Sequence, residues 1–445
     1  MPIQSPDDAL DPLSAPAGGP YAWYTLAVLI LAYTFSFIDR QILTLLVGPI
    51  RASLHITDFQ LSLLHGLAFA LFYTVLGIPI GRLVDRRRRT AIISGGIAVW
   101  SIMTALCGLA RSFGQLFIAR IGVGVGEAAL SPGAYSLLSD RFPPRELPRA
   151  INIYTGAAYF GAGIATIAGG ALIALMPALT LPFVGRVEAW QSVFIAVGLP
   201  GLLVALLVLS LKEPVRHDIR HDLAEAQPRI ATVIHYLWTR KAAFGLVILG
   251  YSIFGIIWNG ALAWLPSFLM RTHGWDVADV GLYYGLTIMI GGTIGVVLGG
   301  SWTVRLRAAG HMDSNIRIGL YALALAAPLG IATVLAPTGE MALGGILLFL
   351  TACAMPWGGA AAALQEITPN RMRGQVSAIY LFFLSLLGMG FGPTIVAGFT
   401  DHLFANDMAV GRSIAVTILL AAPVSATLLL LSRRGYCAIL ARHMG

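Results

Sequence analysis

Long apolar stretches recur along the chain at the spacing expected for many membrane-crossing helices. A window of about 19 residues, the length that crosses a hydrocarbon core, finds six apolar blocks, then a polar stretch, then six more. The first six blocks are 22–47, 58–82, 90–110, 114–138, 150–176 and 189–211. The second six are 243–270, 278–303, 316–336, 340–364, 374–399 and 412–433. This pattern predicts an all-α membrane protein with twelve transmembrane helices in two groups of six.

The loops after the fourth and tenth predicted helices look alike. The first-half residues Asp140, Pro143, Arg145 and Tyr154 are matched, at one constant offset, by Glu366, Pro369, Arg371 and Tyr380. Turn and topology preferences alone also favour a short loop with an acidic residue, Pro and Arg, but four matches at one offset favour a duplication. The sequence therefore predicts two pseudo-symmetric six-helix bundles, the arrangement that many transporters place around a midplane site.

Polar segments separate and flank the two bundles. We expect a disordered cytoplasmic tail over 1–20, a first bundle over 21–211, a cytoplasmic linker over 212–240, a second bundle over 241–433 and a cytoplasmic tail over 434–445. Residues 1–20 lack the basic segment, short apolar segment and cleavage site of a signal peptide.

The linker combines a possible amphipathic helix with a polar stretch. Apolar residues recur there at helical spacing and predict a helix at the membrane surface: Ile230, Val233, Ile234, Leu237 and Trp238. The preceding stretch contains potential metal ligands: His217, Asp218, His221, Asp222 and Glu225. These residues fit a solvated linker better than a metal site. We therefore expect no bound metal, and we expect no cofactor.

Composition and charge support a membrane protein and orient it. The chain is 57% hydrophobic and 11% charged, so lipid must solvate much of its surface. Of its 29 Lys and Arg residues, 22 lie in segments on the same face as the termini and 5 on the opposite face. This asymmetry predicts cytoplasmic termini in a bacterial inner membrane, and the scattered charges indicate no nucleic-acid partner. The three cysteines have no metal or disulfide spacing.

Four charged residues interrupt predicted spans: Asp39 and Arg40 in the first, Arg120 and Glu127 in the fourth. An ionised side chain near the bilayer centre costs about 3 kcal/mol on insertion scales, so such residues usually pair and usually serve function. Adjacent helix residues point about 100° apart, and residues seven apart lie about 10 Å apart along the axis. The four residues must therefore pair between the two helices, as Arg40 with Glu127 and Asp39 with Arg120 or in the other combination.

This cluster suggests proton coupling. Burial raises a carboxylate pKa while a nearby Arg lowers it, so a conformational change that alters the Arg contact would change proton occupancy. We therefore hypothesise that Asp39 and Glu127 bind protons and that Arg40 and Arg120 set the proton affinity of these carboxylates. Arg40 is also available to an anionic head group. The alternative is a structural ion-pair network that sets helix register.

Four short segments carry a resemblance to a known family. The loop after the second span contains Gly81, Leu83, Asp85, Arg86, Arg88 and Arg89, which resembles the signature of the major facilitator superfamily, although Arg87 replaces the usual Gly. Within that superfamily, three segments resemble the spinster family: Phe37 to Arg40, Arg120 to Ala128, and Lys212 to Pro214. The resemblance implies a proton-linked, alternating-access carrier of lysophospholipids or phosphorylated sphingoid lipids, with the proton gradient as its energy source.

The second half offers an uncharged wall for the expected cavity. The interiors of its spans have no clear charged residue but carry aromatic and polar side chains, and such a cavity suits an amphipathic ligand. The candidate lining residues are His65, Tyr154, Trp258, Asn259, Trp357 and Tyr380. Packing between helices is the alternative for each aromatic residue, and a hydrogen-bonded packing role is the alternative for His65.

A cytoplasmic gate follows from the loops. Asp85 and Arg86 can pair with Asp140, Arg145 or the start of the eleventh helix when this side closes. The second-half equivalents Glu366 and Arg371 complete the expected gate. Exposed charges of this kind also serve simply as topology signals.

Three other functional classes remain to be compared with a lipid carrier. A carrier of drugs or small organic anions would use the same charged pocket for a smaller ligand. An enzyme is disfavoured because no nucleophile, metal cluster or nucleotide loop is present in the sequence. A channel would need a polar lining in both halves. We expect a monomer whose partners are protons, membrane lipid and a small-molecule substrate.

Overall fold

The computed structural model describes residues 19–143, 145–182, 185–214 and 230–444. Within these residues twelve helical segments are long and apolar enough to cross a membrane, so the predicted twelve-helix fold is confirmed. The spans are Pro20–Leu45, Asp58–Gly77, Arg89–Cys107, Phe113–Arg141, Leu147–Leu175, Ala189–Leu209, Phe244–His273, Val277–Ala308, Ser314–Val334, Gly339–Glu366, Asn370–Leu403 and Asp407–Ala441.

The first six spans form one half of the molecule. Its elements are α1 (Pro20–Leu45), α2 (Val47–Leu54), α3 (Asp58–His65), α4 (Leu67–Arg86), α5 (Arg89–Cys107), α6 (Phe113–Glu127), α7 (Leu130–Arg141), α8 (Leu147–Leu175), β1 (Leu179–Leu181), β2 (Gly185–Val187) and α9 (Ala189–Leu209). Strands β1 and β2 pair antiparallel as a short hairpin.

The last six spans form the second half, which contains several short π-helical segments. Its helices are α11 (Ile230–Thr239), α12 (Phe244–His273), α13 (Val277–Asp279), η1 (Val280–Tyr284), α14 (Gly285–Ala308), α15 (Ser314–Val334), α16 (Gly339–Ala354), α17 (Trp357–Glu366), η2 (Asn370–Met372), α18 (Arg373–Phe383), η3 (Leu384–Phe391), α19 (Gly392–Gly398), η4 (Phe399–Leu403), η5 (Asp407–Ala409) and α20 (Val410–Met444).

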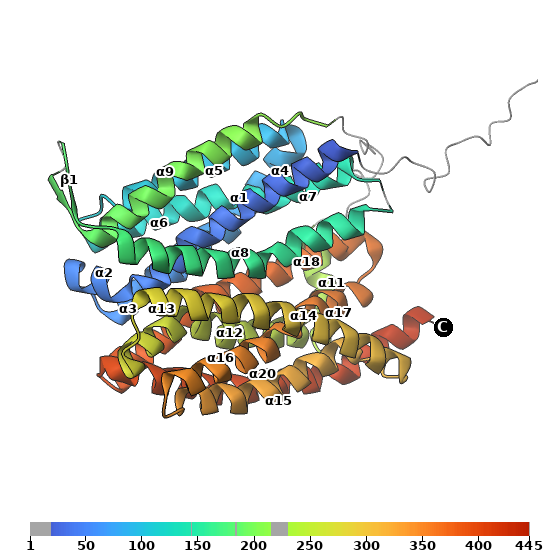
Figure 1. Ribbon diagram of the computed structural model, residues 1–445. Coiled ribbons are helices and arrows are strands. Elements are labelled where there is room, and N and C mark those ends of the chain that lie inside the picture. Colours follow the sequence, from blue (N-terminus) through green and yellow to red (C-terminus); the bar gives the residue numbers. More distant parts are fainter. Residues whose placement is uncertain (1–18, 144, 183–184, 215–229, 445) are drawn as a thin grey trace, which may run out of the picture.

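The two halves lie side by side with their helices running in one general direction (Figure 1). Helix α1 begins and helix α20 ends at one end of the molecule, which we call the terminus face. The β1–β2 hairpin lies at the other end, which we call the opposite face. The charge asymmetry of the loops predicts that the terminus face is cytoplasmic.

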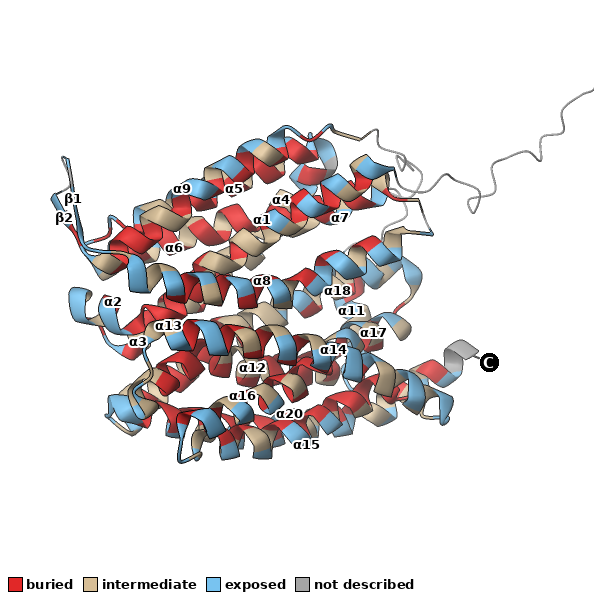
Figure 2. Cartoon of the chain, viewed as in Figure 1, coloured by how far each residue is buried: buried red, intermediate tan, exposed pale blue. Residues whose placement is uncertain are grey.

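Exposed residues lie on the outside of both halves, and buried residues lie between the helices (Figure 2). Leu203, Val297 and Leu420 are among the large hydrophobic residues that point outward. In water such a surface would be unfavourable, but lipid tails are a suitable solvent for it. The burial pattern thus agrees with twelve helices surrounded by membrane.

The fourth and tenth spans are each broken by a proline. Pro132 has no N–H to donate to the Ala128 carbonyl, and helix α6 ends just before this point, at Glu127. Pro356 separates helices α16 and α17 in the same way. The break therefore leaves Glu127 at the end of a helix within the span, where its side chain is buried.

Glycine residues bring the two halves into close contact. A side chain built on Gly163 of helix α8 would come within 2.7 Å of the Gly285 carbonyl oxygen of helix α14, and one on Gly285 would meet the Gly163 carbonyl at the same distance. Only glycine permits two helix backbones to approach this closely. Helices α8 and α14 therefore pack tightly across the boundary between the halves.

Parts of the predicted domain organisation fall outside the described residues. These parts are residues 1–18 of the expected tail and 215–229 of the linker, which include His217, Asp218, His221, Asp222 and Glu225. Linker residues 230–239 form helix α11, whose Val233 is buried while Ile230, Ile234 and Trp238 are exposed. At the other end, helix α20 continues past Arg433 to Met444.

Candidate functional site

Two buried ion pairs join helices α1 and α6. The Arg40 guanidinium donates to the Glu127 carboxylate, and the Arg120 guanidinium donates to the Asp39 carboxylate. Asp39 and Arg40 are neighbours that point in different directions around helix α1, so each meets a different partner. Arg120 and Glu127 lie seven residues apart on helix α6, and the long side chain of each arginine reaches a carboxylate on the other helix. All four intramembrane charges are thereby paired.

Each of the two carboxylates retains one oxygen atom without a hydrogen-bond partner in the described structure. These atoms are Asp39 Oδ1 and Glu127 Oε1, and both are buried. A buried carboxylate oxygen without a donor is unfavourable when the group is ionised, because its desolvation is not compensated. A proton on that oxygen would remove the penalty, so either group is a chemically suitable proton acceptor.

The two arginines differ in their access to ligand. The side chain of Arg40 is 23% exposed, whereas that of Arg120 is 1% exposed. The Arg40 guanidinium carbon lies 4.3 Å from the centre of the Phe69 ring and 5.4 Å from that of Phe37. These cation–π contacts hold Arg40 in place at the cavity wall while leaving part of it free. Both arginines line the cavity described next, but Arg40 is the more accessible of the two to a ligand.

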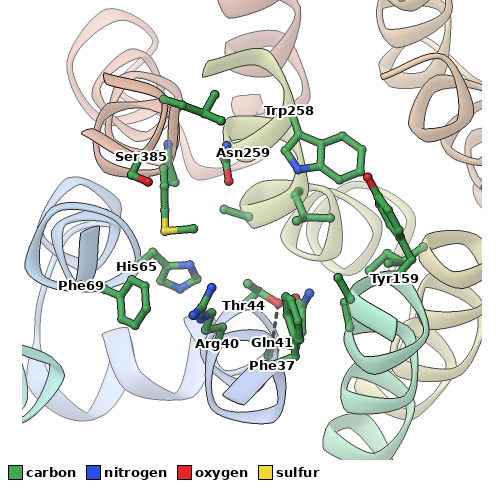
Figure 3. Close-up of a pocket in the computed structure, with 18 of the residues that line it drawn as sticks. Phe37, Arg40, Gln41, Thr44, His65, Phe69, Tyr159, Trp258, Asn259 and Ser385 are labelled. Carbon is green, nitrogen blue, oxygen red and sulfur yellow. Dashed lines mark hydrogen bonds between the residues drawn. The ribbon is translucent and has the colours of Figure 1, made fainter. Parts of the chain in front are cut away.

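A cavity of about 370 Å³ lies between the halves, next to Arg40 (Figure 3). Figure 3 shows Arg40, Gln41 and His65 from the first half facing Asn259 and Ser385 from the second half. Aromatic rings form much of the remaining wall: Tyr33, Phe37, Phe69, Tyr159, Trp258 and Trp357. We call this the inner cavity. It has one cationic wall and an otherwise apolar and aromatic lining with a few polar groups.

A larger cavity of about 1010 Å³ continues toward the terminus face. Helices α4 and α7 line it from the first half, and helix α18 lines it from the second. Ser385 lines both cavities, so the two adjoin. Leu381 and Phe382 contribute to its apolar wall, while Arg82 and Arg371 also line it. We call this the outer cavity, and it gives the inner cavity a route toward the terminus face.

Four of the six predicted lining residues reach the inner cavity: His65, Trp258, Asn259 and Trp357. The structure places Tyr154 and Tyr380 elsewhere, buried among helices and away from the linings of these two cavities. Tyr154 stacks on Tyr33, with ring centres 4.9 Å apart, and thus supports a lining residue from behind. Helical periodicity alone does not distinguish such a second layer from the cavity wall.

Two of the predicted gate residues on the terminus face form ion pairs within their own halves. Asp140 accepts from Arg89 and Glu366 accepts from Arg307, both ion pairs inside one half. Arg145 is exposed, and Arg371 lines the outer cavity. Helix α4 contains Asp85 and Arg86, but the side chain of Asp85 lies outside the described part of the structure. The gate therefore remains a prediction for a state in which this face closes.

Arg89 connects three segments of the first half at this face. It donates to Glu213 Oε1 at 2.8 Å through Nε and to the Pro214 carbonyl at 3.1 Å through Nη2, in addition to its contact with Asp140. Burial favours a higher pKa for Glu213, but hydrogen bonds from Arg89 and Thr90 outweigh it and hold that pKa below its usual range. This network fixes the ends of helices α5, α7 and α9 relative to one another.

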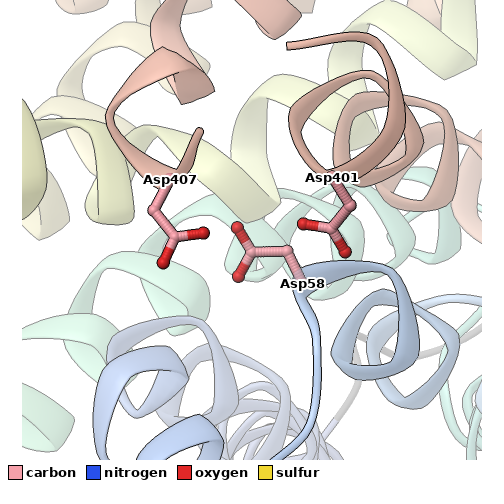
Figure 4. Close-up of side chains that lie close together, drawn as sticks. All are labelled: Asp58, Asp401 and Asp407. Atoms are coloured by element: carbon pink, nitrogen blue, oxygen red, sulfur yellow. The ribbon is translucent and has the colours of Figure 1, made fainter. Parts of the chain in front are cut away.

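Ion pairs on the opposite face join the two halves, and the sequence did not predict them. Their three carboxylates, Asp58, Asp401 and Asp407, lie close together (Figure 4). Arg271 of the second half donates to both oxygens of Asp58 at 2.6 and 2.8 Å. Arg51 of the first half donates to both oxygens of Asp407 at 2.8 and 3.2 Å. The Phe59 amide donates to Asp401 at 2.7 Å. We call these contacts the opposite-face cluster.

The opposite-face cluster is best described as a set of ion pairs. The carboxylates of Asp58, Asp401 and Asp407 offer oxygen atoms within 4.8 Å of one another, a spacing that a metal ion could use. Arg51 and Arg271 already neutralise two of them. Burial favours a lower pKa for Arg51, but Asp407 and Asp58 outweigh it and keep that pKa above its usual range. The only signal in the sequence was that Arg51 and Arg271 belong to the five basic residues of this otherwise weakly basic face.

Comparisons with known proteins identify relatives that span most of the chain. A sequence model described as "Major Facilitator Superfamily" matches residues 29–393. An "MFS-type efflux pump" of Mycolicibacterium smegmatis is 28% identical over 426 residues, 94% of each protein. "Protein spinster" of Drosophila melanogaster is 25% identical over 417 residues, 90% of this chain and 66% of that protein.

A solved structure extends the likeness to three dimensions. It is described as a bacterial homologue of the human lysosomal transporter Spinster in an inward-facing and unoccupied conformation. Its TM-score is 0.78 at 28% sequence identity, and the match covers 95% of this chain and 97% of that one.

Proposed function

Because this chain belongs to the Major Facilitator Superfamily, and is therefore a secondary transporter and not an enzyme, we propose that it carries an amphipathic lipid coupled to protons. The ligand class is a lysophospholipid or a phosphorylated sphingoid base, which combines an anionic phosphate with one long apolar chain. The proposed residues are Asp39, Arg40, Arg120 and Glu127.

The observation that carries this proposal is an accessible cation in the inner cavity that adjoins a larger cavity with a mainly apolar wall. Arg40 is accessible in the inner cavity, and the outer cavity continues from it past Ser385 with Leu381 and Phe382 on its wall. A phosphate at Arg40 would gain a charge-assisted hydrogen bond. An acyl chain in the outer cavity would be removed from water.

Proton coupling follows from competition between Glu127 and the ligand head group for Arg40. When Glu127 is ionised it holds the Arg40 guanidinium, and when Glu127 is protonated that ion pair is lost. Arg40 is then available to an anionic head group, so proton and ligand each favour the binding of the other. Linkage requires this effect to be reciprocal. The ion pair of Arg120 with Asp39 is more deeply buried. It would respond to the protonation of Glu127, because both ion pairs join helices α1 and α6.

Alternating access would use contacts at the two faces in turn. The opposite-face cluster holds the halves together in the present conformation, while the outer cavity leads toward the terminus face. With cytoplasmic termini this is an inward-facing state. Closure of the terminus face would bring Asp85, Arg86, Asp140, Arg145, Glu366 and Arg371 into contact as the cytoplasmic gate.

A drug or a small organic anion is the alternative ligand. The similarity to an efflux pump over nearly the whole chain favours this candidate. The inner cavity alone, at about 370 Å³, is also within the size range of small-molecule pockets. Such a ligand would occupy the inner cavity and leave the outer cavity to water.

Transport in proteoliposomes tests the function. We expect a pH gradient to drive movement of a fluorescent lysophospholipid by the wild-type protein. Glu127→Gln and Asp39→Asn should abolish the response to the gradient, while Glu340→Gln, which changes an exposed carboxylate at the start of helix α16, should leave it intact. Continued proton-driven transport by both cavity variants would refute the coupling assignment.

Equilibrium binding separates the two ligand classes. Trp258 and Trp357 line the inner cavity, so ligand binding should change tryptophan fluorescence. We expect lysophospholipid to bind more tightly as the pH falls, and Glu127→Gln to bind tightly at every pH. Saturable binding of small organic anions together with no binding of lysophospholipid would favour the alternative carrier.

A further inference from the structure

Small side chains leave a groove on the outer surface of the second half, between helices α15 and α20. The groove has a volume of about 580 Å³, and both helices lie at the edge of the molecule remote from the first half (Figure 1). Ala327 of helix α15 and Ala426 of helix α20 line it, and Pro423 bends the wall because it lacks an N–H. It is separate from both transport cavities.

The groove has the length of a lipid tail and the orientation of a membrane helix. Its lining residues extend from Arg317 to Ile331 on helix α15 and from Ile418 to Arg433 on helix α20. At 1.5 Å per residue, the two walls are about 21 Å and about 23 Å long. Both exceed the ~15 Å depth of one leaflet of hydrocarbon. An acyl chain is therefore a better match than a compact ligand.

Two arginines stand at the terminus-face end of the groove. Arg433 lies 23 residues after the start of helix α20 at Val410, which is about 35 Å along the axis and beyond a ~30 Å hydrocarbon core. Arg317 is in the first turn of helix α15. Both guanidinium groups consequently lie at the level of lipid head groups.

A buried aspartate holds these two arginines in the groove wall. The Nε atoms of Arg317 and Arg433 donate to different oxygens of Asp313, at 2.7 and 2.5 Å. Two positive charges and one negative charge leave a net charge of +1 at this end. The arginines are partly exposed, whereas Asp313 is buried. The site therefore presents a fixed positive charge to the membrane.

We propose that this groove binds an anionic phospholipid of the surrounding membrane, with its phosphate at Arg317 and Arg433 and its acyl chains between helices α15 and α20. The charge complementarity with an anionic head group selects among lipids, since the apolar walls accept any tail. The proposal is independent of what the central cavity transports.

Native mass spectrometry of the purified full chain, titrated with phosphatidylglycerol or phosphatidylcholine, tests the proposal. We expect wild type to bind phosphatidylglycerol more tightly than phosphatidylcholine. An arginine near a charged lipid surface contributes about fivefold in affinity, so the double variant Arg317→Gln, Arg433→Gln should lose roughly 30-fold for phosphatidylglycerol. Arg434→Gln, an exposed neighbour on the same helix, should bind as wild type does.

A second variant controls for effects of the lost charges on folding. Ala327→Phe fills the groove and leaves Asp313, Arg317 and Arg433 intact, and it should also weaken phosphatidylglycerol binding. Equal affinity of wild type for the two lipids would overturn the proposal. So would wild-type affinity for phosphatidylglycerol in Ala327→Phe, because the tails would then lie elsewhere.

Discussion

At the scale of single residues, exposure separates two ion pairs that look equivalent in the sequence. Arg40 and Arg120 each pair with one carboxylate of the same cluster, but only Arg40 is substantially open to the inner cavity. The same residue type therefore has two roles. Arg40 lines the inner cavity and pairs with Glu127, the proposed proton-binding group, whereas Arg120 neutralises Asp39 inside the first half.

We predict different effects on ligand binding when these two arginines are removed. Arg40→Ala should weaken binding of an anionic ligand by about 2 kcal/mol, roughly 30-fold, because a charge-assisted hydrogen bond is lost. Arg120→Ala should change ligand affinity much less. Both variants should lower the free energy of unfolding by about 3–5 kcal/mol, because each leaves one buried carboxylate, Glu127 or Asp39, without its partner. Ligand titration in detergent measures the difference, and equal losses of ligand affinity would contradict the separation of roles.

A further residue-scale prediction concerns acid stability. The pKa of Glu213 is lower in the folded protein than in the unfolded chain, so its ionised form stabilises the fold above the unfolded pKa of about 4.3. This contribution is lost as the pH falls through the lowered folded pKa.

Melting temperatures measured from pH 7 to pH 3 check this prediction. Glu213→Gln should lower the melting temperature at pH 7 and show a smaller further decrease in acid than wild type shows. Glu188→Gln, which changes an exposed carboxylate at the opposite face, provides the matched control. Parallel curves for Glu213→Gln and wild type would contradict the prediction.

At the scale of elements, breaks and close approaches in the helices position the charges. Pro132 ends the regular part of the fourth span just after Glu127, and glycines let helices α5 and α6 touch. A side chain built on Gly126 would lie 2.6 Å from both the Gly96 carbonyl oxygen and the Trp100 amide nitrogen. The close contact of Gly126 with the backbone of helix α5 thus holds the adjacent Glu127 in position, in addition to the ion pair with Arg40.

We therefore predict that Gly126→Ala destabilises the first half, because helix α6 must move away from the backbone of helix α5. Overpacking of this kind costs about 1–3 kcal/mol. Gly114→Ala in the same helix meets no atom within 4 Å and should have no such cost. Thermal unfolding of both variants in detergent checks the prediction. Equal stability of the two would show that helix α6 shifts freely.

At the scale of the whole molecule, the contacts between the halves decide which face is open. The Asp58–Arg271 and Arg51–Asp407 pairs cross from one half to the other on the opposite face, whereas Asp140–Arg89 and Glu366–Arg307 stay within one half. Asp58 is completely buried and meets both arginines, so it is the centre of the cluster. Loss of these pairs would favour the state in which the terminus face closes.

We predict that Asp58→Asn shifts the conformational equilibrium by about tenfold or more toward the state in which the terminus face is closed. The reason is that hydrogen bonds between charged groups contribute about 1.5–3 kcal/mol each. The rate at which a cysteine at Ser385 is labelled from the terminus side of proteoliposomes measures the shift, and it should fall. Arg186→Gln removes an exposed pair with Glu188 that stays within the first half and should leave labelling unchanged. Unchanged labelling in Asp58→Asn would exclude a gating role for the cluster.

The sequence by itself determined the class, the number of spans and the four intramembrane charges. These features depend on local composition, since about 20 apolar residues must cross the membrane and a charge among them is conspicuous wherever it occurs. The resemblance to the superfamily and to spinster proteins, stated from short motifs, is confirmed by relatives and a solved structure that span most of the chain.

Only the tertiary structure decided which side chains meet across the two halves. Tyr154 and Trp258 are both aromatic residues within spans. Tyr154 packs behind Tyr33, whereas Trp258 lines the inner cavity. The difference arises because the rotation of each helix about its axis depends on the neighbouring helices. The opposite-face cluster joins helical residues that are far apart in the sequence, and the groove at Arg317 and Arg433 joins two helices that are also far apart in the sequence. Such contacts depend on packing between helices, which no local pattern records.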